Sequence, residues 1–360
     1  MININGKEAS MKAKYLFIIS LIITLFFCSN TIAELKTIQL ITTGGAISGT
    51  QKNMLSGKFK LGARNAETLV ASNIEILELA DIRFNELYNL PSQEITTKHW
   101  IKLAKEIEKA VNDITIDAVV ITHGTDTLDE TAYFLNLTIK TKKPIIITGA
   151  IRAALHPSSD SAQNLIDSVR VAINDKAKSK GVLVVSNGKI ISARQVQKNY
   201  NHSLDAIESS EIGLLGYVHN EIVDFHTTSI KKHTLYSEFD IKTISDLPEV
   251  DIIYTYAGGT NLHITKPIKG LVVAGVGAGN MNKETIKKLK ELQKNNIQVV
   301  RSTRNIGAPL YSSQSSEIND KFLNFISSNN LSPQKARILL MLSLEKTKNP
   351  SKIRSYFETH

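Results

Sequence analysis

Two short segments rich in threonine and glycine contain the residues best suited to chemistry. Residues 42–45 (Thr-Thr-Gly-Gly) follow the apolar run 38–41, and residues 122–127 (Thr-His-Gly-Thr-Asp-Thr) follow the apolar run 118–121. In open α/β sheets, catalytic residues gather at the carboxyl ends of parallel strands, where loops are firmly held yet free of core packing. Glycine lets backbone N–H groups approach a ligand closely, which suits a site that stabilises a developing oxyanion. The pattern indicates an enzyme with a threonine nucleophile, while ordinary turn formation remains an alternative reason for each glycine.

A threonine hydroxyl is a weak nucleophile, so its neighbours decide whether it can react. Asp126 stands beside Thr125 and is one candidate helper. Lys198 is another, because a lysine that desolvation or a like charge keeps unprotonated can accept a proton. Lysine is more often an exposed charge, and the sequence leaves both interpretations of Lys198 open.

Other chemistries find less support. Residues 275–280 (Gly-Val-Gly-Ala-Gly-Asn) partly imitate a dinucleotide-binding loop, but Asn280 replaces its last small residue and Arg301 stands where an acidic ribose ligand is expected. An NADP-type site could use that arginine, so an oxidoreductase remains an alternative. The sequence has no H-E-x-x-H, G-x-S-x-G or P-loop motif. Its histidines at 219, 226 and 233 are too widely spaced for a local metal-ligand pair, and we interpret them as linker or surface residues.

The elements that must position these residues alternate strand-like runs with helical patterns, which is typical of parallel β-α-β construction. We expect strands at 37–42, 73–79, 118–122, 144–148, 181–185, 251–256, 270–274 and 297–300. Helical spacing marks 100–111, 160–173, 283–292 and 333–346, together with a helix that begins after Thr127. Thr127 and Glu130 fit a capping box at its start.

The composition allows a substantial core, since 42% of the 360 residues are apolar and 21% are charged. We expect two α/β domains with largely parallel sheets, the larger one N-terminal. The expected division is a signal peptide at 1–33, an N-terminal domain carrying the active site at 34–225, a linker at 226–250 and a C-terminal domain at 251–360. The net charge of +9 comes from scattered lysines without interleaved aromatics, which favours a solvated surface over nucleic-acid binding.

Residues 1–33 have the pattern of a secretory signal peptide, with an apolar run at 15–27 and a small-residue cleavage site ending at Ala33. The run is shorter than the ~20 residues of a membrane-spanning helix, so no membrane association is expected after cleavage. Met11 is an alternative start to the first residue. Cys28 is the only cysteine and lies in the removed segment, so we expect neither a disulfide nor a thiolate metal site in the mature chain.

With both threonine segments placed, the chain resembles the bacterial-type L-asparaginase family, and in particular its secreted type II branch. The resemblance extends from about Glu34 to the C-terminus. It depends on residues 43–47 (Thr-Gly-Gly-Ala-Ile), 121–127, 130–135, 274–277 and 333–337 (Pro-Gln-Lys-Ala-Arg).

The resemblance implies hydrolysis of L-asparagine without a metal or cofactor, and it leaves L-glutamine open as a second substrate. It implies that Thr43 attacks the side-chain amide carbon and forms a β-aspartyl ester, which water then hydrolyses. Thr125, Asp126 and Lys198 match the family's second catalytic group, in which the lysine helps to deprotonate the threonine or its water.

The same resemblance implies the substrate-binding residues. Asp126 would bind the α-ammonium group, and Ser92 with Gln93 would bind the α-carboxylate. Backbone N–H groups of Thr125 and Ala150 match the oxyanion position. Family members are homotetramers of two intimate dimers, and Glu317 matches a glutamate donated across such a dimer. The signal peptide implies a periplasmic location.

Three positions depart from the family pattern. Met54 stands where the flexible lid usually carries a tyrosine that polarises the first threonine, and a thioether has no proton to transfer. Ala46 replaces the usual threonine beside the nucleophile, and Gly258 replaces an asparagine of the partner-subunit site. A catalytically weakened amide-binding protein with the same fold is therefore a competing hypothesis.

Overall fold

The computed structural model describes residues 34–51, 59–60, 64–209, 212–260, 262–305, 309–311 and 318–360. The expected signal peptide with Cys28, the lid position Met54 and the predicted site residue Glu317 lie outside these ranges. Residues 36–360 form one compact unit. No helix in the described ranges is long and apolar enough to cross a membrane.

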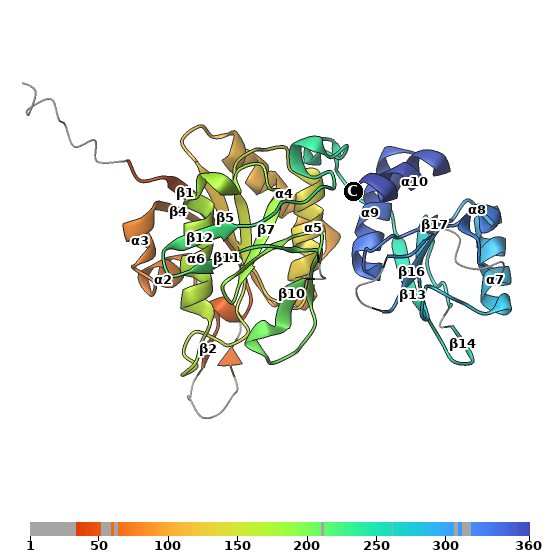
Figure 1. Cartoon of the computed structure of the whole chain (residues 1–360), viewed down its shortest axis with the longest axis horizontal. Coiled ribbons are helices and arrows are strands. Elements are labelled where there is room, and N and C mark those ends of the chain that lie inside the picture. Colours follow the sequence, from red (N-terminus) through yellow and green to blue (C-terminus); the bar gives the residue numbers. More distant parts are fainter. Residues whose placement is uncertain are drawn as a thin grey trace, which may run out of the picture. The chain divides into compact units, whose positions relative to one another are not determined.

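A large mixed sheet forms the N-terminal half (Figure 1). Its strands are β1 (Thr37–Gly44), β4 (Asp81–Leu90), β5 (Ala118–Thr122), β6 (Ile145–Thr148), β7 (Val182–Ser186), β8 (Lys189–Ser192), β11 (Leu214–His219) and β12 (Ile222–Phe225). The spatial order is β12-β11-β8-β7-β6-β5-β1-β4. The strands from β4 through β1, β5 and β6 to β7 are parallel, and β8, β11 and β12 continue the sheet antiparallel.

The strand order reverses at β1. The chain passes from β1 to its neighbour β4 on one side and then returns to β5 on the other side. Ligands of open α/β sheets bind at such a switch point, outside the carboxyl ends of the strands. The loops that follow β1 and β5 are the two threonine-glycine segments, so the topology places both at this crevice.

Helices cover both faces of the large sheet because its central strands are apolar on both sides. Val120 and Ile146 belong to one buried cluster with α2 (Ala66–Ala71), α3 (Ile76–Leu79) and α6 (Ser161–Ile173). Ile121 and Ile147 belong to another, with α4 (Thr97–Asn112) and α5 (Leu128–Thr138). This alternation along β5 and β6 is the period of two that a strand imposes.

The C-terminal half contains a smaller sheet in the order β14-β13-β15-β16-β17. All its pairs are parallel except β13 with β14. Its elements are β13 (Val250–Tyr256), β14 (Gly259–Thr260), β15 (Gly270–Gly275), α7 (Lys283–Lys294), β16 (Gln298–Thr303), α8 (Asp320–Leu323), β17 (Ile326–Ser327), α9 (Pro333–Lys346) and α10 (Pro350–Thr359). Leu339 and Leu340 of α9 share one buried cluster with Phe134 of α5, so the core is continuous between the halves.

Short elements complete the described chain. They are β2 (Thr50–Gln51), β3 (Phe59–Lys60), β9 (Val196–Lys198), β10 (Ile207–Ser209) and the 3-10 helices η1 (Ala46–Ser48), η2 (Ser92–Glu94), η3 (Asp175–Ala177), η4 (Leu204–Ala206), η5 (Thr234–Tyr236) and η6 (Ile241–Thr243). Residues 226–250, predicted as a linker, contribute the buried side chains of Phe239 and Ile241 to the continuous core.

The predicted class of two α/β units with largely parallel sheets is confirmed, but two local predictions are wrong. The segment 73–79, predicted as a strand, is a turn followed by α3. Ile76 is buried whereas Ile74 is exposed, so the burial does not have the two-residue period of a strand. The capping box at Thr127 is also absent. Its hydroxyl donates to the backbone oxygen of Ser92 instead.

Candidate active site

The two threonine-glycine loops meet through their glycines. Gly45 has a φ of 87°, and a Cβ built on it would lie 2.5 Å from the Cα of Gly124. A Cβ on Gly124 would lie 2.7 Å from Oγ of Ser92. These approaches exclude any side chain, because real Cβ contacts do not reach such distances. The glycines thus bring the loops after β1, β4 and β5 into backbone contact.

Thr43 lies at the carboxyl end of β1, two residues before Gly45. Its side chain is 2% exposed, and its hydroxyl donates to the backbone oxygen of Thr122 over 2.9 Å. Thr122 belongs to the neighbouring strand β5, where it pairs with Thr42. Attack on a bound carbonyl therefore requires the Thr43 hydroxyl to exchange this acceptor for a base.

The second predicted group is assembled in the structure. The side-chain nitrogen of Lys198 donates to Oγ1 of Thr125 over 3.0 Å and to Oδ1 of Asp126 over 2.6 Å. The Lys198 side chain is 18% exposed, so it is not the solvated surface charge that its residue type most often indicates. It reaches this position from β9, which pairs antiparallel with β10. The arrangement can pass a proton between the amine and the Thr125 hydroxyl.

A cavity of about 260 Å³ opens between these loops. The predicted residues Ser92, Gln93, Thr125, Asp126, Ala150 and Lys198 all line it, as do Gly45, Ala46, Pro91, Gly124, Ile151, Asn201 and His202. Thr43 lies next to Gly45 and Ala46 in the chain but is not itself part of this lining. The cavity therefore unites six predicted site residues with the loop that follows the predicted nucleophile.

Hydrogen bonds hold the loop at Ser92 against the Asp126 loop. The backbone N–H of Asp126 donates to Oγ of Ser92 over 3.2 Å, and the Thr127 hydroxyl donates to the backbone oxygen of Ser92 over 2.8 Å. Ser92 is 4% exposed, whereas Gln93 is exposed. Gln93 is thus the residue of this pair whose side-chain amide is exposed at the cavity.

A buried histidine, His123, contacts the backbone of the Thr125 loop. His123 is 1% exposed, and its Nδ1 lies 2.7 Å from the backbone oxygen of Gly124. Its Nε2 lies 3.0 Å from Oγ1 of Thr131, which accepts the indole N–H of Trp100. Burial lowers the pKa of His123 to about 4, so the ring is neutral at pH 7. Since a backbone oxygen can only accept, Nδ1 carries the proton, and Nε2 accepts from Thr131.

Ionisable side chains lie just after the Thr125–Asp126 loop, in the first turn of α5, and in the first turn of α9. Burial raises the pKa of Asp129, and burial together with the charge of Asp129 raises the pKa of Glu130 to about 7. Lys335 of α9 is 2% exposed, and burial lowers its pKa to about 8. Its positive charge acts on both carboxyl groups in the opposite direction to burial. Asp129, Glu130 and Lys335 therefore form one group of interacting ionisable side chains.

Several of these residues were not predicted from the sequence. Asn201 and His202 follow Lys198 without any motif, and Lys335 had no assigned role. The prediction that His233 is a linker or surface residue is wrong in its exposure, since it is 6% exposed and lies 3.0 Å from the hydroxyl of Thr234. The ring at 226, by contrast, is exposed as predicted.

The dinucleotide alternative fails on Arg301. Its side chain is 0% exposed, and its guanidinium donates to both carboxylate oxygens of Asp320 and to the backbone oxygens of Ala278 and Tyr311. These contacts use four of its five N–H groups, and the guanidinium is buried, so it is not available to bind the phosphate of a cofactor. The described residues also contain no group of three or more His, Cys, Asp or Glu side chains that could hold a metal ion.

Comparison with known proteins agrees with this geometry. A family model described as "Asparaginase, N-terminal" matches residues 37–231, and one described as "Glutaminase/Asparaginase C-terminal domain" matches residues 249–357. The chain is 38% identical to the probable periplasmic L-asparaginase of Haemophilus influenzae, over 91% of this chain and 93% of that protein. It is 34% identical to the glutaminase-asparaginase of Pseudomonas fluorescens biotype A, over 91% of each chain.

A solved structure shows the same fold. The crystal structure of a probable cytoplasmic L-asparaginase from Campylobacter jejuni superposes with a TM-score of 0.84 at 40% identity, covering 90% of this chain and 100% of that one. Fold, cavity and relatives together define an amidohydrolase. The chain belongs to the bacterial-type L-asparaginase family.

Proposed function

We propose that this enzyme hydrolyses the side-chain amide of L-asparagine to L-aspartate and ammonia, with L-glutamine as a second substrate. The observation that carries the proposal is the contact of Lys198 with both Thr125 and Asp126 at the wall of the cavity. This places an amine, a hydroxyl and a carboxylate around one small polar space, which suits a zwitterionic carboxamide.

The first half-reaction forms an ester. Oγ1 of Thr43 attacks the side-chain carbonyl carbon, and the carbon–nitrogen bond of the amide breaks. The hydroxyl proton moves to the leaving nitrogen, which departs as ammonia. Backbone N–H groups of Thr125 and Ala150 are assigned to the oxyanion, where fixed donors stabilise developing charge. The hydrogen bonds from Ile151 N and Arg152 N to the Asp160 carboxylate support this, because they hold the loop after Ala150 in place.

The second half-reaction hydrolyses the ester. Thr125 orients a water molecule, and Lys198, as the free amine, removes its proton through the Thr125 hydroxyl. The hydroxide attacks the ester carbon, and the bond between that carbon and Oγ1 of Thr43 breaks. The proton held by Lys198 then passes to Oγ1 of Thr43. In this scheme Lys198 acts as the general base, and Asp126 holds it by a charge-assisted hydrogen bond.

The same cavity provides recognition of the substrate. Asp126 is assigned to the α-ammonium group, and Ser92 with Gln93 to the α-carboxylate. Glu317 is proposed to reach the site of a partner subunit in a homotetramer built as a dimer of dimers. The 60% exposure of the Asp126 side chain supports this assembly, since a second subunit could complete an open site.

We further propose residues 1–33 as a cleaved signal peptide, residues 34–225 and 251–360 as the two domains, and residues 226–250 as their linker. The enzyme would then act in the periplasm. One relative is named periplasmic, which supports this location, while the related Campylobacter jejuni protein is named cytoplasmic.

A catalytically weakened amide-binding protein is the second candidate. Among the described residues, the Thr43 hydroxyl donates its hydrogen bond to a backbone oxygen and not to a base. Met54 at the lid position adds no proton donor.

Steady-state release of ammonia with aspartate from L-asparagine, and of ammonia with glutamate from L-glutamine, measured beside calorimetric binding of both amides, separates the two candidates. Catalytic release of ammonia with an equal amount of aspartate supports the enzyme. Saturable binding of asparagine without ammonia release would establish the binding protein instead.

A further inference from the structure

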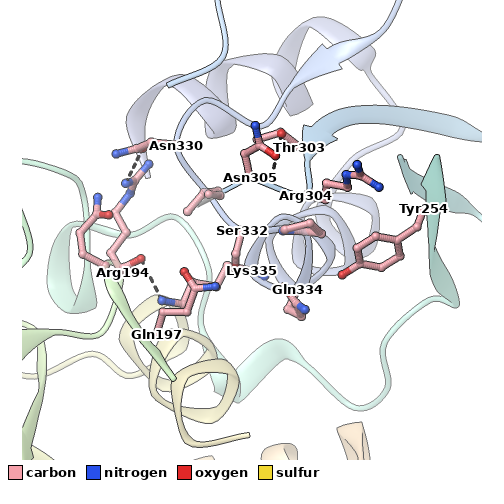
Figure 2. A pocket seen from close by; sticks show the side chains of 13 residues that line it. Arg194, Gln197, Tyr254, Thr303, Arg304, Asn305, Asn330, Ser332, Gln334 and Lys335 are labelled. Atoms are coloured by element: carbon pink, nitrogen blue, oxygen red, sulfur yellow. Dashed lines mark hydrogen bonds between the residues drawn. The ribbon is translucent and has the colours of Figure 1, made fainter. Parts of the chain in front are cut away.

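Lys335 is a buried lysine far from the predicted site residues in the chain but close to the strand that carries one of them. It lies in the first turns of α9, in the C-terminal half, and is 2% exposed. Figure 2 shows it beside Arg194 and Gln197 at the wall of a second cavity of about 140 Å³. Lysine is rarely buried without a specific partner, so its contacts indicate its role.

Those partners are two backbone oxygens on the approach to Lys198. The Lys335 nitrogen donates to the backbone oxygen of Arg194 over 3.1 Å and also to the backbone oxygen of Val196. Arg194 lies in the turn at residues 193–195, and Val196 is the first residue of β9. Lys198 is the last residue of the same short strand, two positions after Val196. One ammonium group therefore fixes the backbone from which the Lys198 side chain extends.

The same ammonium group lies near the other side of the site. Its charge opposes the effect of burial on the carboxyl groups of Asp129 and Glu130, in the first turn of α5. That turn follows Thr125 and Asp126 directly in the chain. Lys335 is thus bound to the segment that leads into the strand carrying the amine, and its charge acts on the helix that begins just after the loop with the hydroxyl and carboxylate.

We propose that Lys335 is a positioning residue that sets the distance between Lys198 and the Thr125–Asp126 pair. It contacts neither substrate nor reacting atoms and acts through the backbone of residues 194–196. The inference rests on the proposed role of Lys198 as the base. Its consequence is that a residue of the C-terminal half controls turnover in the N-terminal active site.

The first test compares two neutral variants of the same helix. Lys335→Met removes the contacts with the β9 approach, and Arg337→Met is the matched control. The Arg337 side chain donates over 2.7 Å to the backbone oxygen of Val250 in β13, which carries no predicted catalytic residue. Because displacement of a catalytic group by about 1 Å can cost ~100-fold in rate, we expect kcat of Lys335→Met to fall by about that factor. KM should stay near the wild-type value, since Ser92 and Gln93 are not held by Lys335.

Arg337→Met should lose stability but keep kcat. Melting temperatures of both variants and kcat per folded active site separate a positioning role from a loss of fold. Equal kcat in wild type and Lys335→Met would overturn the inference, as would equal kcat losses in the two variants. An inactive wild-type enzyme would instead contradict the proposed function, so the two failures are distinguishable.

The second test restores the ammonium group chemically. Lys335→Ala removes three carbons and the nitrogen, which n-propylammonium can replace through the adjoining cavity. Aspartate formation should recover by about 10-fold from the ~100-fold loss, while tetramethylammonium at equal ionic strength, which has no N–H donor, should have no effect. Equal effects of the two cations would overturn the inference. If the neutral variants do not fold, Lys335→Arg retains charge and donors in altered geometry, and it must lower kcat at unchanged KM.

Discussion

The side-chain nitrogen of Lys198 lies 3.0 Å from Oγ1 of Thr125, although 73 positions separate the two residues in the chain. The contact depends on β9, which carries the lysine, and on the loop after β5, which carries the threonine. The pair is only partly exposed, because the surrounding loops meet at their backbones. The two atoms are within the distance that proton transfer between an amine and a hydroxyl requires.

Replacement of Lys198 by methionine should reduce kcat by about 10²–10⁴-fold, which is the usual contribution of a general base. Lys189→Met is the matched control, because Lys189 also pairs with a carboxylate, that of Asp205, at 3.1 Å but outside the cavity. Steady-state ammonia release checks both variants. Unchanged turnover in Lys198→Met would remove the lysine from the mechanism.

Thr43→Ala should abolish turnover while substrate binding persists, because the variant loses only the attacking oxygen. The control is Thr42→Val, one residue earlier in β1. The Thr42 hydroxyl is buried and makes no hydrogen bond with the described residues, so its loss should leave activity near the wild-type level. Ammonia assays and calorimetric titration with L-asparagine test this. Near-normal activity of Thr43→Ala would disprove the nucleophile assignment.

Gly45→Ala should lower activity by more than about 100-fold, because the added Cβ forces the Gly124 loop away by a distance that misplaces Thr125. Gly188→Ala is the control. It also has a positive φ, of 70°, but it lies in the turn between β7 and β8 and has only the backbone oxygen of Val218 at 3.1 Å. The control should lose about 1 kcal/mol of stability and keep its kcat. Similar kcat values for the two variants would refute the close-contact argument.

Glu130 should make the stability depend on pH. Its pKa is raised in the folded state from 4.5 to about 7, so the folded protein binds this proton more tightly than the unfolded chain. The contribution is fully present below pH 4.5 and is lost as the pH rises to about 7, by at most ~3 kcal/mol. Urea unfolding of wild type and Glu130→Gln between pH 4.5 and pH 8 measures the difference.

His123 has the opposite sign in an overlapping range. Its lowered pKa removes stability as the pH falls from 6.5 towards 4. Both proteins in the Glu130 comparison contain His123, so its effect cancels when the two unfolding free energies are subtracted. Parallel pH dependences of wild type and Glu130→Gln would show that Glu130 is not protonated in the folded state near neutral pH.

The sequence predicted the parallel core well because apolar runs such as 118–121 are buried on both faces and leave few alternatives. The helix 333–346 was predicted with its observed ends, since Ser332 caps it and Pro333 occupies its first turn. The segment 73–79 was misassigned because short apolar runs do not distinguish a helical turn from a strand. The strand next to β1 is instead β4, which follows this segment in the chain. It lies at the edge of the sheet, and its mostly exposed side chains give little periodic signal.

Six of the site residues matched to the family line one cavity, whereas Thr43 is not part of that lining and Glu317 lies outside the described residues. The contacts that hold these six residues in place were not predictable from the sequence. The contact of Lys335 with the backbone at 194–196 joins segments about 140 positions apart and uses backbone oxygens, which leave no mark on the sequence. The tautomer of His123 likewise depends on Thr131 and Gly124 as partners. Such contacts follow from tertiary packing and not from local pattern.

Trp100 is the only tryptophan of the 360 residues. Its indole stacks on Phe134 at a centroid distance of 5.5 Å and is linked through Thr131 to the histidine beneath the Thr125 loop. The fluorescent indole is therefore connected by hydrogen bonds through Thr131 and His123 to the loop that lines the cavity. Its intrinsic emission can follow occupancy of the crevice in real time, without any label.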